Sequence, residues 1–156
     1  MNSFSVEYSK AEYRKLAPKK EVAAFLKRVL EHENLDGVQF SVSFVKEEEI
    51  QSLNLQYRNL DESTDILSFA LQDGADNSSF ITAPSRYLYI GDMVICPEVC
   101  ERNAAVLGLS TDEELHRLLV HGVLHLSGMD HKSNDAFEPM LMHQEDIMKK
   151  LYSRSN

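Results

Sequence analysis

The order in which two hydrophobic periodicities alternate along the chain is the feature that most constrains its fold. Residues 3–8 alternate apolar and polar side chains as a strand does, and residues 17–33 repeat apolar side chains at helical spacing. The same succession of strand and helix returns in residues 38–45 and 47–58. Two strands and three helices follow. This β-α-β-α-β-β-α-α-α order predicts an α+β fold, in which a mixed sheet of about four strands is covered by about five helices.

The two later strands are expected in residues 64–71 and 87–95, and the second of them is expected to be broken at Gly91 and Asp92. Residues 72–86 between them are mostly polar or small, and we expect them to form a longer loop than most compact domains carry without a function or some disorder.

The C-terminal third is predicted to be helical over residues 97–107, 110–128 and about 135–151. The middle helix has clear end signals, because Ser110 and Glu113 form a capping box and Gly128 is suited to the position just after the helix.

Length and composition predict one domain, residues 1–156, because a chain of 156 residues with 43% hydrophobic content can bury one substantial core. The N-terminus carries charges where a signal peptide needs an apolar run, so we expect a cytoplasmic protein, and no segment has the apolar length of a membrane span. The two cysteines, Cys96 and Cys100, are interpreted as small buried apolar residues.

The formal net charge of −9 argues against nonspecific binding of nucleic acid, and DNA is not an expected partner. Residues 1–28 nevertheless hold seven Lys or Arg against three Glu, a local excess of +4. Either this segment is a basic face that holds a phosphate backbone, or it is an ordinary solvated helix surface.

Residues 121–131 read "HGVLHLSGMDH" and place three histidines at a spacing typical of a metal site. His121 and His125 lie four residues apart, so both leave one face of the helix, and a chain reversal at Gly128 would bring His131 back toward them. Three imidazoles leave a fourth position open, as in catalytic zinc, whereas structural zinc normally has four protein ligands. Nickel, cobalt or copper would also accept such ligands.

The position after the first histidine is Gly122, where zinc peptidases with this spacing carry their general base, a glutamate. Peptide hydrolysis is therefore disfavoured, unless Glu114 or Glu138 replaces that base. Cleavage of a phosphodiester makes different demands, since a metal ion and one cation can stabilise the charge that develops on the phosphate. Gly122 could permit close backbone approach beside the metal or tight packing of the helix on the sheet.

Four neighbouring residues are interpreted more weakly. Asp130 either orients an imidazole or caps the chain reversal, and Asp65 either pairs with Arg58 or fixes a loop. Thr64 is a possible cap at the start of its strand, and Ser68 is given no chemical role. His116 and His143 fall outside the metal spacing and are expected to be ordinary surface residues.

The stretch "HGVLHLSGMDH" resembles the signature H-G-x-L-H-L-x-G-x-D-H of the YbeY family of bacterial metal-dependent endoribonucleases. Upstream, "LNLQYRNLDESTDILSFAL" is similar to the family segment in which an arginine precedes a T-(D/N)-(V/I)-L-S-F strand, and "GDMVI" resembles the strand that follows. Downstream, "MLMHQEDIM" resembles the closing helix. The resemblance covers about residues 45–150; it departs from the family at Ala70, where a proline is frequent, and in the longer loop that follows.

The resemblance implies a zinc-dependent, single-strand-specific endoribonuclease that acts in maturation of the 16S ribosomal RNA 3′ end and in ribosome quality control. It implies one Zn²⁺ per chain on His121, His125 and His131, with single-stranded and ribosomal RNA, the ribosome or ribosomal proteins as partners. Arg58 becomes the candidate catalytic cation, because a guanidinium offers a planar fork of donors to a phosphate; a surface salt bridge is its alternative role. A zinc metalloprotease-like hydrolase and a ribosome-associated module with structural zinc are the other functions considered.

Overall fold

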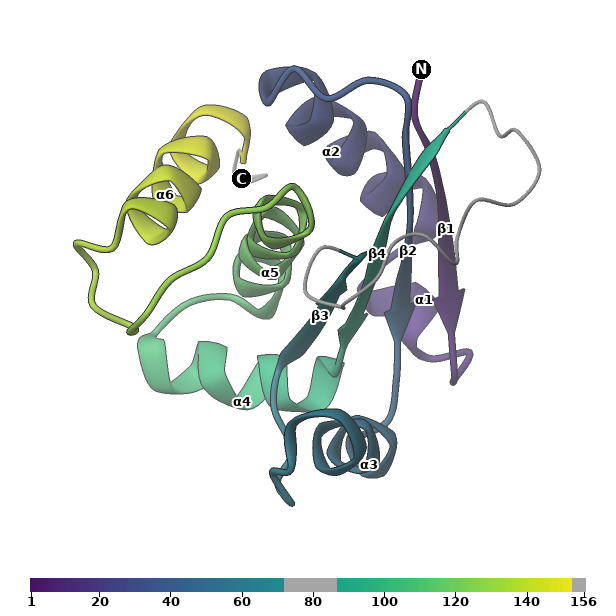
Figure 1. Cartoon of the computed structure of the whole chain (residues 1–156). Helices are drawn as coiled ribbons and strands as arrows, with labels where there is room; N and C mark the ends of the chain where they lie inside the picture. Colours follow the sequence, from purple (N-terminus) through teal and green to yellow (C-terminus); the bar gives the residue numbers. More distant parts are fainter. Residues whose placement is uncertain (72–86, 153–156) are drawn as a thin grey trace.

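The structure is a computed structural model that describes residues 1–71 and 87–152. Its strands form one sheet in the order β1-β2-β4-β3 (Figure 1). Strands β1, β2 and β4 run parallel to one another, whereas β3 pairs antiparallel with β4 at the edge of the sheet. The strands are β1 (Ser3–Tyr8), β2 (Val38–Phe44), β3 (Ile66–Ala70) and β4 (Leu88–Ile95).

The described part of the chain contains six helices, one more than the sequence predicts. They are α1 (Tyr13–Leu16), α2 (Lys19–His32), α3 (Glu47–Arg58), α4 (Pro97–Leu107), α5 (Thr111–Leu126) and α6 (Pro139–Leu151). The additional helix, α1, is a single turn that buries Tyr13, whose hydroxyl donates to Glu98 of α4 at 2.6 Å. The predicted α+β class with a mixed sheet of four strands is confirmed, and the solved structure reported below has the same fold.

The last helix begins at Pro139 and not near Asp135 as predicted. Residues 135–138 instead form a turn, in which the side chain of Asp135 accepts a hydrogen bond from the Phe137 N–H at 2.9 Å. A proline disfavours helical geometry in the residue before it and is itself well suited to the first helical position. Glu138 accordingly has an extended ψ of 131°, and the helix starts one residue later.

Strand β4 is continuous through Gly91 and Asp92, so the prediction of a broken strand is wrong. The register instead shifts by one residue opposite Gln39 and Phe40, which is a β-bulge. Gly91 has φ +139°, and a Cβ at this position would overlap the carbonyl oxygen of Phe69 on β3. A glycine is therefore required where β3 and β4 approach each other.

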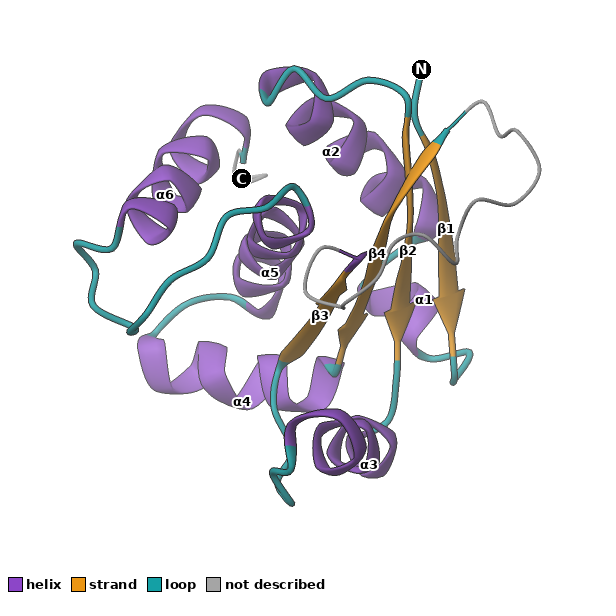
Figure 2. Ribbon diagram, viewed as in Figure 1, coloured by secondary structure: helices purple, strands orange, loops and turns teal. Residues whose placement is uncertain are grey.

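The main hydrophobic core lies between one face of the sheet and helices α2, α5 and α6 (Figures 1 and 2). Helix α5 is central to it, since it contacts β3 and β4 as well as α2, α4 and α6. A smaller cluster joins Ile50 of α3 to Leu67 of β3 and Val94 of β4. Because α5 lies against the edge strand, residues at its C-terminal end reach the same region as residues of β3 and α3.

Within residues 1–71 and 87–152, none of the helices combines the length and the apolar character that crossing a bilayer requires.

Candidate active site

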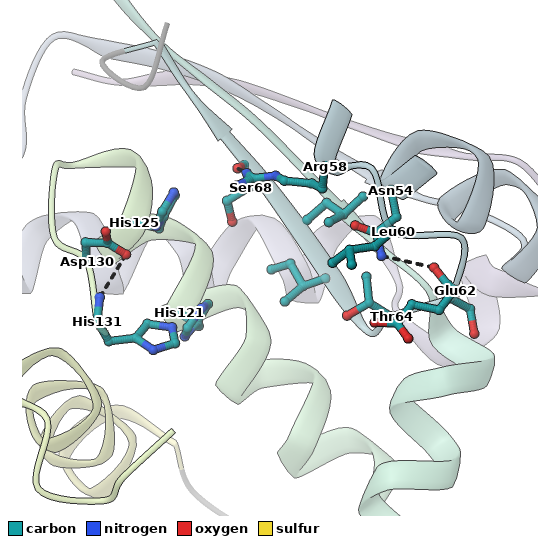
Figure 3. A pocket seen from close by; sticks show the side chains of 13 residues that line it. Asn54, Arg58, Leu60, Glu62, Thr64, Ser68, His121, His125, Asp130 and His131 are labelled. Atoms are coloured by element: carbon teal, nitrogen blue, oxygen red, sulfur yellow. Dashed lines mark hydrogen bonds between the residues drawn. The ribbon is translucent and has the colours of Figure 1, made fainter. Parts of the chain in front are cut away.

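A pocket of about 350 Å³ lies between the C-terminal part of α5 and the segment formed by α3 and β3 (Figure 3). Its walls bring together His121, His125 and His131, the predicted metal ligands, and Arg58, the predicted cation. The histidines lie on one side of the pocket, and Arg58 reaches in from the other beside Ser68. Residues that the sequence singles out separately thus share one site.

The geometry of the histidines follows from how α5 ends. His121 and His125 are one turn apart, and the helix stops at Leu126 with Ser127 as its cap. Gly128 then takes φ +111°, and the Met129 N–H returns to the Leu124 carbonyl at 3.0 Å. This is the predicted reversal at a glycine. It brings His131 back toward the helix, so that its ring centroid lies 5.3 Å from that of His121.

Two of the imidazoles have their Nδ1 atoms engaged away from the pocket. His121 Nδ1 lies 2.9 Å from Gln144 Oε1, and His131 Nδ1 lies 2.7 Å from the carbonyl oxygen of Ser133. A carbonyl oxygen only accepts, so each Nδ1 carries the proton and each Nε2 keeps its lone pair. This is the arrangement that metal-bound histidines usually show. Burial also lowers the pKa of His121, which favours the neutral form that a metal needs.

The donor set therefore fits a metal ion in residue type and in hydrogen bonding. Over residues 1–71 and 87–152, however, no three His, Cys, Asp or Glu side chains already stand in a metal-holding cluster. The assignment of His121, His125 and His131 as ligands stays a prediction.

Arg58 is the last residue of α3, and its guanidinium reaches over the edge strand. Nη2 donates to the Ser68 carbonyl at 2.8 Å, and Cζ lies 5.7 Å from the centroid of the Phe69 ring. No ion pair of Arg58 occurs among the residues that the structure describes. Its planar donors are thus oriented by a carbonyl and a ring, and several N–H groups remain for a ligand in the pocket.

Asn54 also lines the pocket, although the sequence did not single it out. It is only 3% exposed, and its side-chain Nδ2 donates to the Glu62 carbonyl at 3.0 Å. Its backbone carbonyl accepts from the Leu60 N–H at 3.3 Å. Asn54 thereby closes the turn that follows Arg58. The sequence signal for its burial was its spacing, because Asn54 lies four residues after Ile50 and therefore on the same face of the helix.

Tyr57, in contrast, lies outside the buried face of α3. It is 59% exposed and meets Phe69 edge to face, with 5.3 Å between the ring centroids.

The polar residues that flank the pocket make mostly local contacts. Asp65 accepts a hydrogen bond from Asn103 at 3.3 Å, so it holds a loop and does not pair with Arg58. Asp130 accepts from the backbone N–H of His131 at 2.8 Å, which is the contact of a turn residue. Thr64 Oγ1 lies 3.4 Å from the Asp65 carboxylate.

His116, His143 and the two cysteines lie outside the pocket. His116 is partly buried, with its ring edge to face with Phe25, so it is not the ordinary surface residue that was expected. His143 pairs with Glu33 at 2.7 Å and is about one third exposed. Both cysteines are buried and free, as predicted.

Fold and site together have the character of a metal-dependent hydrolase, with imidazoles at the end of a central helix and an arginine across the pocket from them. A family model described as Endoribonuclease YbeY matches residues 3–152. The chain therefore belongs to the YbeY endoribonuclease family, whose members are metal-dependent hydrolases implicated in ribosomal RNA maturation.

Individual relatives agree with this family. Proteins named endoribonuclease YbeY from Treponema denticola and Persephonella marina are 37% and 35% identical to this chain. The first alignment covers 94% of this chain and 92% of the relative, and the second covers 86% and 84%. The solution structure of TM1509 from Thermotoga maritima superimposes with a TM-score of 0.62 at 26% identity, covering 96% of this chain and 89% of that one.

Proposed function

We propose that this endoribonuclease uses zinc held by His121, His125 and His131, and that it cleaves single-stranded RNA. The observation that carries the proposal is the convergence of three imidazoles and the Arg58 guanidinium on one pocket, although they come from distant parts of the sequence. A bound zinc ion would supply Lewis acidity toward a phosphate oxygen.

The chain's own groups would divide the remaining work between two sides of the pocket. Gln144 and the Ser133 carbonyl hold two of the imidazoles so that their Nε2 lone pairs are available. Opposite them, Arg58 would donate to the phosphate oxygens, where negative charge grows as the phosphodiester is attacked. Because its guanidinium rests against Ser68 and Phe69, little reorientation is needed.

Two features argue against the peptidase alternative. Glu138 does not line the pocket and accepts a hydrogen bond from Ser133. Glu114 lines an adjoining cavity together with His121 and His131, but it is buried there and paired with Arg117 at 3.5 Å. The Ser68 carbonyl, at the outer edge of β3, is also occupied by Arg58, so an extended peptide could not pair with that carbonyl as an added strand.

In the cell, we propose that the enzyme processes ribosomal RNA, specifically the 3′ end of 16S RNA, and takes part in ribosome quality control. Family membership supports this role. The role in turn supports the ribosome or ribosomal proteins as partners and the cytoplasm as the location. We propose further that residues 1–156 act as one endoribonuclease domain.

The direct test is cleavage of a labelled single-stranded RNA, the same RNA in a duplex, and casein by the zinc-loaded protein. Cleavage of the single strand alone is expected, and His125→Ala should abolish it. Cleavage of casein with intact RNA would overturn the proposal. The product ends also identify the attacking group, since a 2′,3′-cyclic phosphate identifies the ribose 2′-hydroxyl and a 3′-hydroxyl identifies water.

Removal of zinc separates this proposal from a module in which zinc is structural. The main core lies between the sheet and α2, α5 and α6, and its buried members include none of the three histidines. We expect a chelator to abolish cleavage while circular dichroism still reports a folded protein. Because zinc binds the folded state, it should raise the free energy of unfolding by about 4 kcal/mol when free zinc is in thousandfold excess over its Kd. Unfolding by the chelator at room temperature would instead favour a structural role.

A further inference from the structure

Gln144 is a polar residue at an apolar position of α6. It is 7% exposed and lies on the face of the helix that also buries Met140, Ile147 and Met148. Both ends of its amide are engaged: Oε1 lies 2.9 Å from His121 Nδ1, and Nε2 donates to Glu145 Oε2 at 3.0 Å. A buried amide is retained at such a position without cost only when both ends find partners.

The polarity of this amide is determined by Glu145. The Glu145 carboxylate receives two hydrogen bonds from Arg117, at 2.8 Å from Nε and 3.0 Å from Nη2. A carboxylate paired with a guanidinium in this way can only accept, so the end of Gln144 that faces it must be the NH₂ group. The oxygen of Gln144 must then face His121.

This polarity determines which nitrogen of His121 carries the proton. An amide oxygen accepts and cannot donate, so Nδ1 of His121 is the N–H and Nε2 holds the lone pair. Since Nδ1 is turned toward α6, Nε2 lies on the other side of the ring. His121 lines the pocket that Arg58 enters.

We propose that Gln144 is a positioning residue, which is held by Glu145 and Arg117 and which fixes His121 in the Nδ1–H tautomer so that Nε2 can bind the metal. That Nε2 binds a metal rests on the proposed function, whereas the Nδ1–H tautomer of His121 rests on the hydrogen bonds alone. His131 receives the same constraint from the backbone carbonyl of Ser133. A backbone carbonyl cannot be removed by mutation, so Gln144 is the contact that substitution can test.

Two substitutions separate the acceptor from the volume of the side chain. Gln144→Leu keeps a similar volume and removes the acceptor, whereas Gln144→Glu keeps an oxygen for His121 and loses only the donor to Glu145. The control is Gln51→Leu, which removes an amide that likewise donates to a carboxylate, that of Asp61 at 3.0 Å. Gln51 lies on α3 and does not line the pocket.

The first measurement is long-range ¹H–¹⁵N NMR of histidine-labelled metal-free protein, at a pH where the imidazoles are neutral. The wild type, Gln144→Glu and Gln51→Leu should show the Nδ1–H form of His121, and Gln144→Leu should show a mixture of tautomers. The Nε2–H form in the wild type would overturn the proposal without any variant, and an unchanged tautomer in Gln144→Leu would also overturn it.

The second measurement is zinc affinity by competition with a chelator, with the melting temperature of the metal-free protein as the control for folding. Gln144→Leu should raise the zinc Kd by about 10- to 100-fold, as removal of a hydrogen-bond partner from a metal-bound histidine typically does. Its melting temperature should stay close to that of Gln51→Leu. An unchanged Kd overturns the positioning role, whereas an unchanged Kd in His121→Ala would overturn the metal site itself.

Discussion

Gly122 shows how a single residue separates this site from that of a peptidase with the same histidine spacing. A Cβ built on Gly122 would lie 2.6 Å from Sδ of Met93 and 3.4 Å from Cδ1 of Ile66. The residue after His121 thus faces the sheet, where Met93 is fully buried. Of the two interpretations of this glycine, the contacts support tight packing of α5 on β4. A glutamate here would enter the core and not the pocket.

Arg58→Lys should keep the fold yet lose most of the cleavage rate. An ammonium is a point charge and cannot reproduce a planar fork that rests on Ser68 and donates to a phosphate. Loss of one well-placed donor to developing charge costs about 100- to 1000-fold, or about 3 to 4 kcal/mol. The measurement is single-turnover cleavage of a short single-stranded RNA at matched zinc occupancy. Rates that agree within a few fold would assign Arg58 a structural role.

His125→Ala should lose most of the bound metal, because two remaining imidazoles make a poor site. Elemental analysis after dialysis against zinc gives the metal content per chain, and His143→Ala, which pairs with Glu33 away from the pocket, is the control. Full zinc content in the His125→Ala protein would show that the predicted ligand set is wrong.

Helix α5 is the element on which fold and site both depend. Its N-terminus is capped by Ser110, whose Oγ accepts from the Glu113 N–H at 3.0 Å. Its middle packs on the sheet, and its last two turns carry His121 and His125 into the pocket. The adjacent edge strand β3 contributes the Ser68 carbonyl that orients Arg58. Any change in how α5 lies on the sheet therefore moves the imidazoles relative to the arginine.

Gly122→Glu should consequently unfold the protein and not create a peptidase. Burying a carboxylate against Met93 and Ile66 without a partner costs several kcal/mol, a large part of the stability of a domain of this size. Gly122→Ala is the control: overpacking costs about 1 to 3 kcal/mol, and the gain in helix propensity offsets about 1 kcal/mol of it. Urea unfolding compares the two variants. A folded Gly122→Glu protein would contradict the packing argument.

At the scale of the whole molecule, the protein is acidic, but its charges are distributed unevenly over the surface. Lys15, Lys19 and Lys20 are exposed, and within the described ranges none of them forms an ion pair. Lys19 and Lys20 line a depression with Arg14 beside β1, at the opposite end of the sheet from β3. Arg28, in contrast, donates to the Leu151 carbonyl at 2.9 Å and holds the last helix. The basic segment is thus part structural and part available to a phosphate backbone.

Neutralising Lys15, Lys19 and Lys20 together should weaken RNA binding and leave the single-turnover rate of saturated enzyme unchanged, because these side chains lie away from the pocket. Each lost contact between a lysine and a phosphate of a single strand lowers the slope of log K against log salt by about 0.7. Loss of all three lysines should therefore lower the slope by up to about 2. Fluorescence anisotropy over a salt series measures it. A slope equal to that of the wild type would mean that these lysines are only solvated surface.

The sequence by itself determined the features that depend on neighbouring residues. Helical periodicity and the glycine at position 128 were sufficient to predict one turn between His121 and His125 and the chain reversal before His131, because both are local properties of the backbone. The tertiary structure alone decided which distant groups meet these histidines. The approach of Arg58, the hydrogen bond between Gln144 and His121 and the burial of Gly122 against Met93 all join separate elements. Such contacts depend on how α5 packs between the edge strand and α6, and no local periodicity encodes that packing.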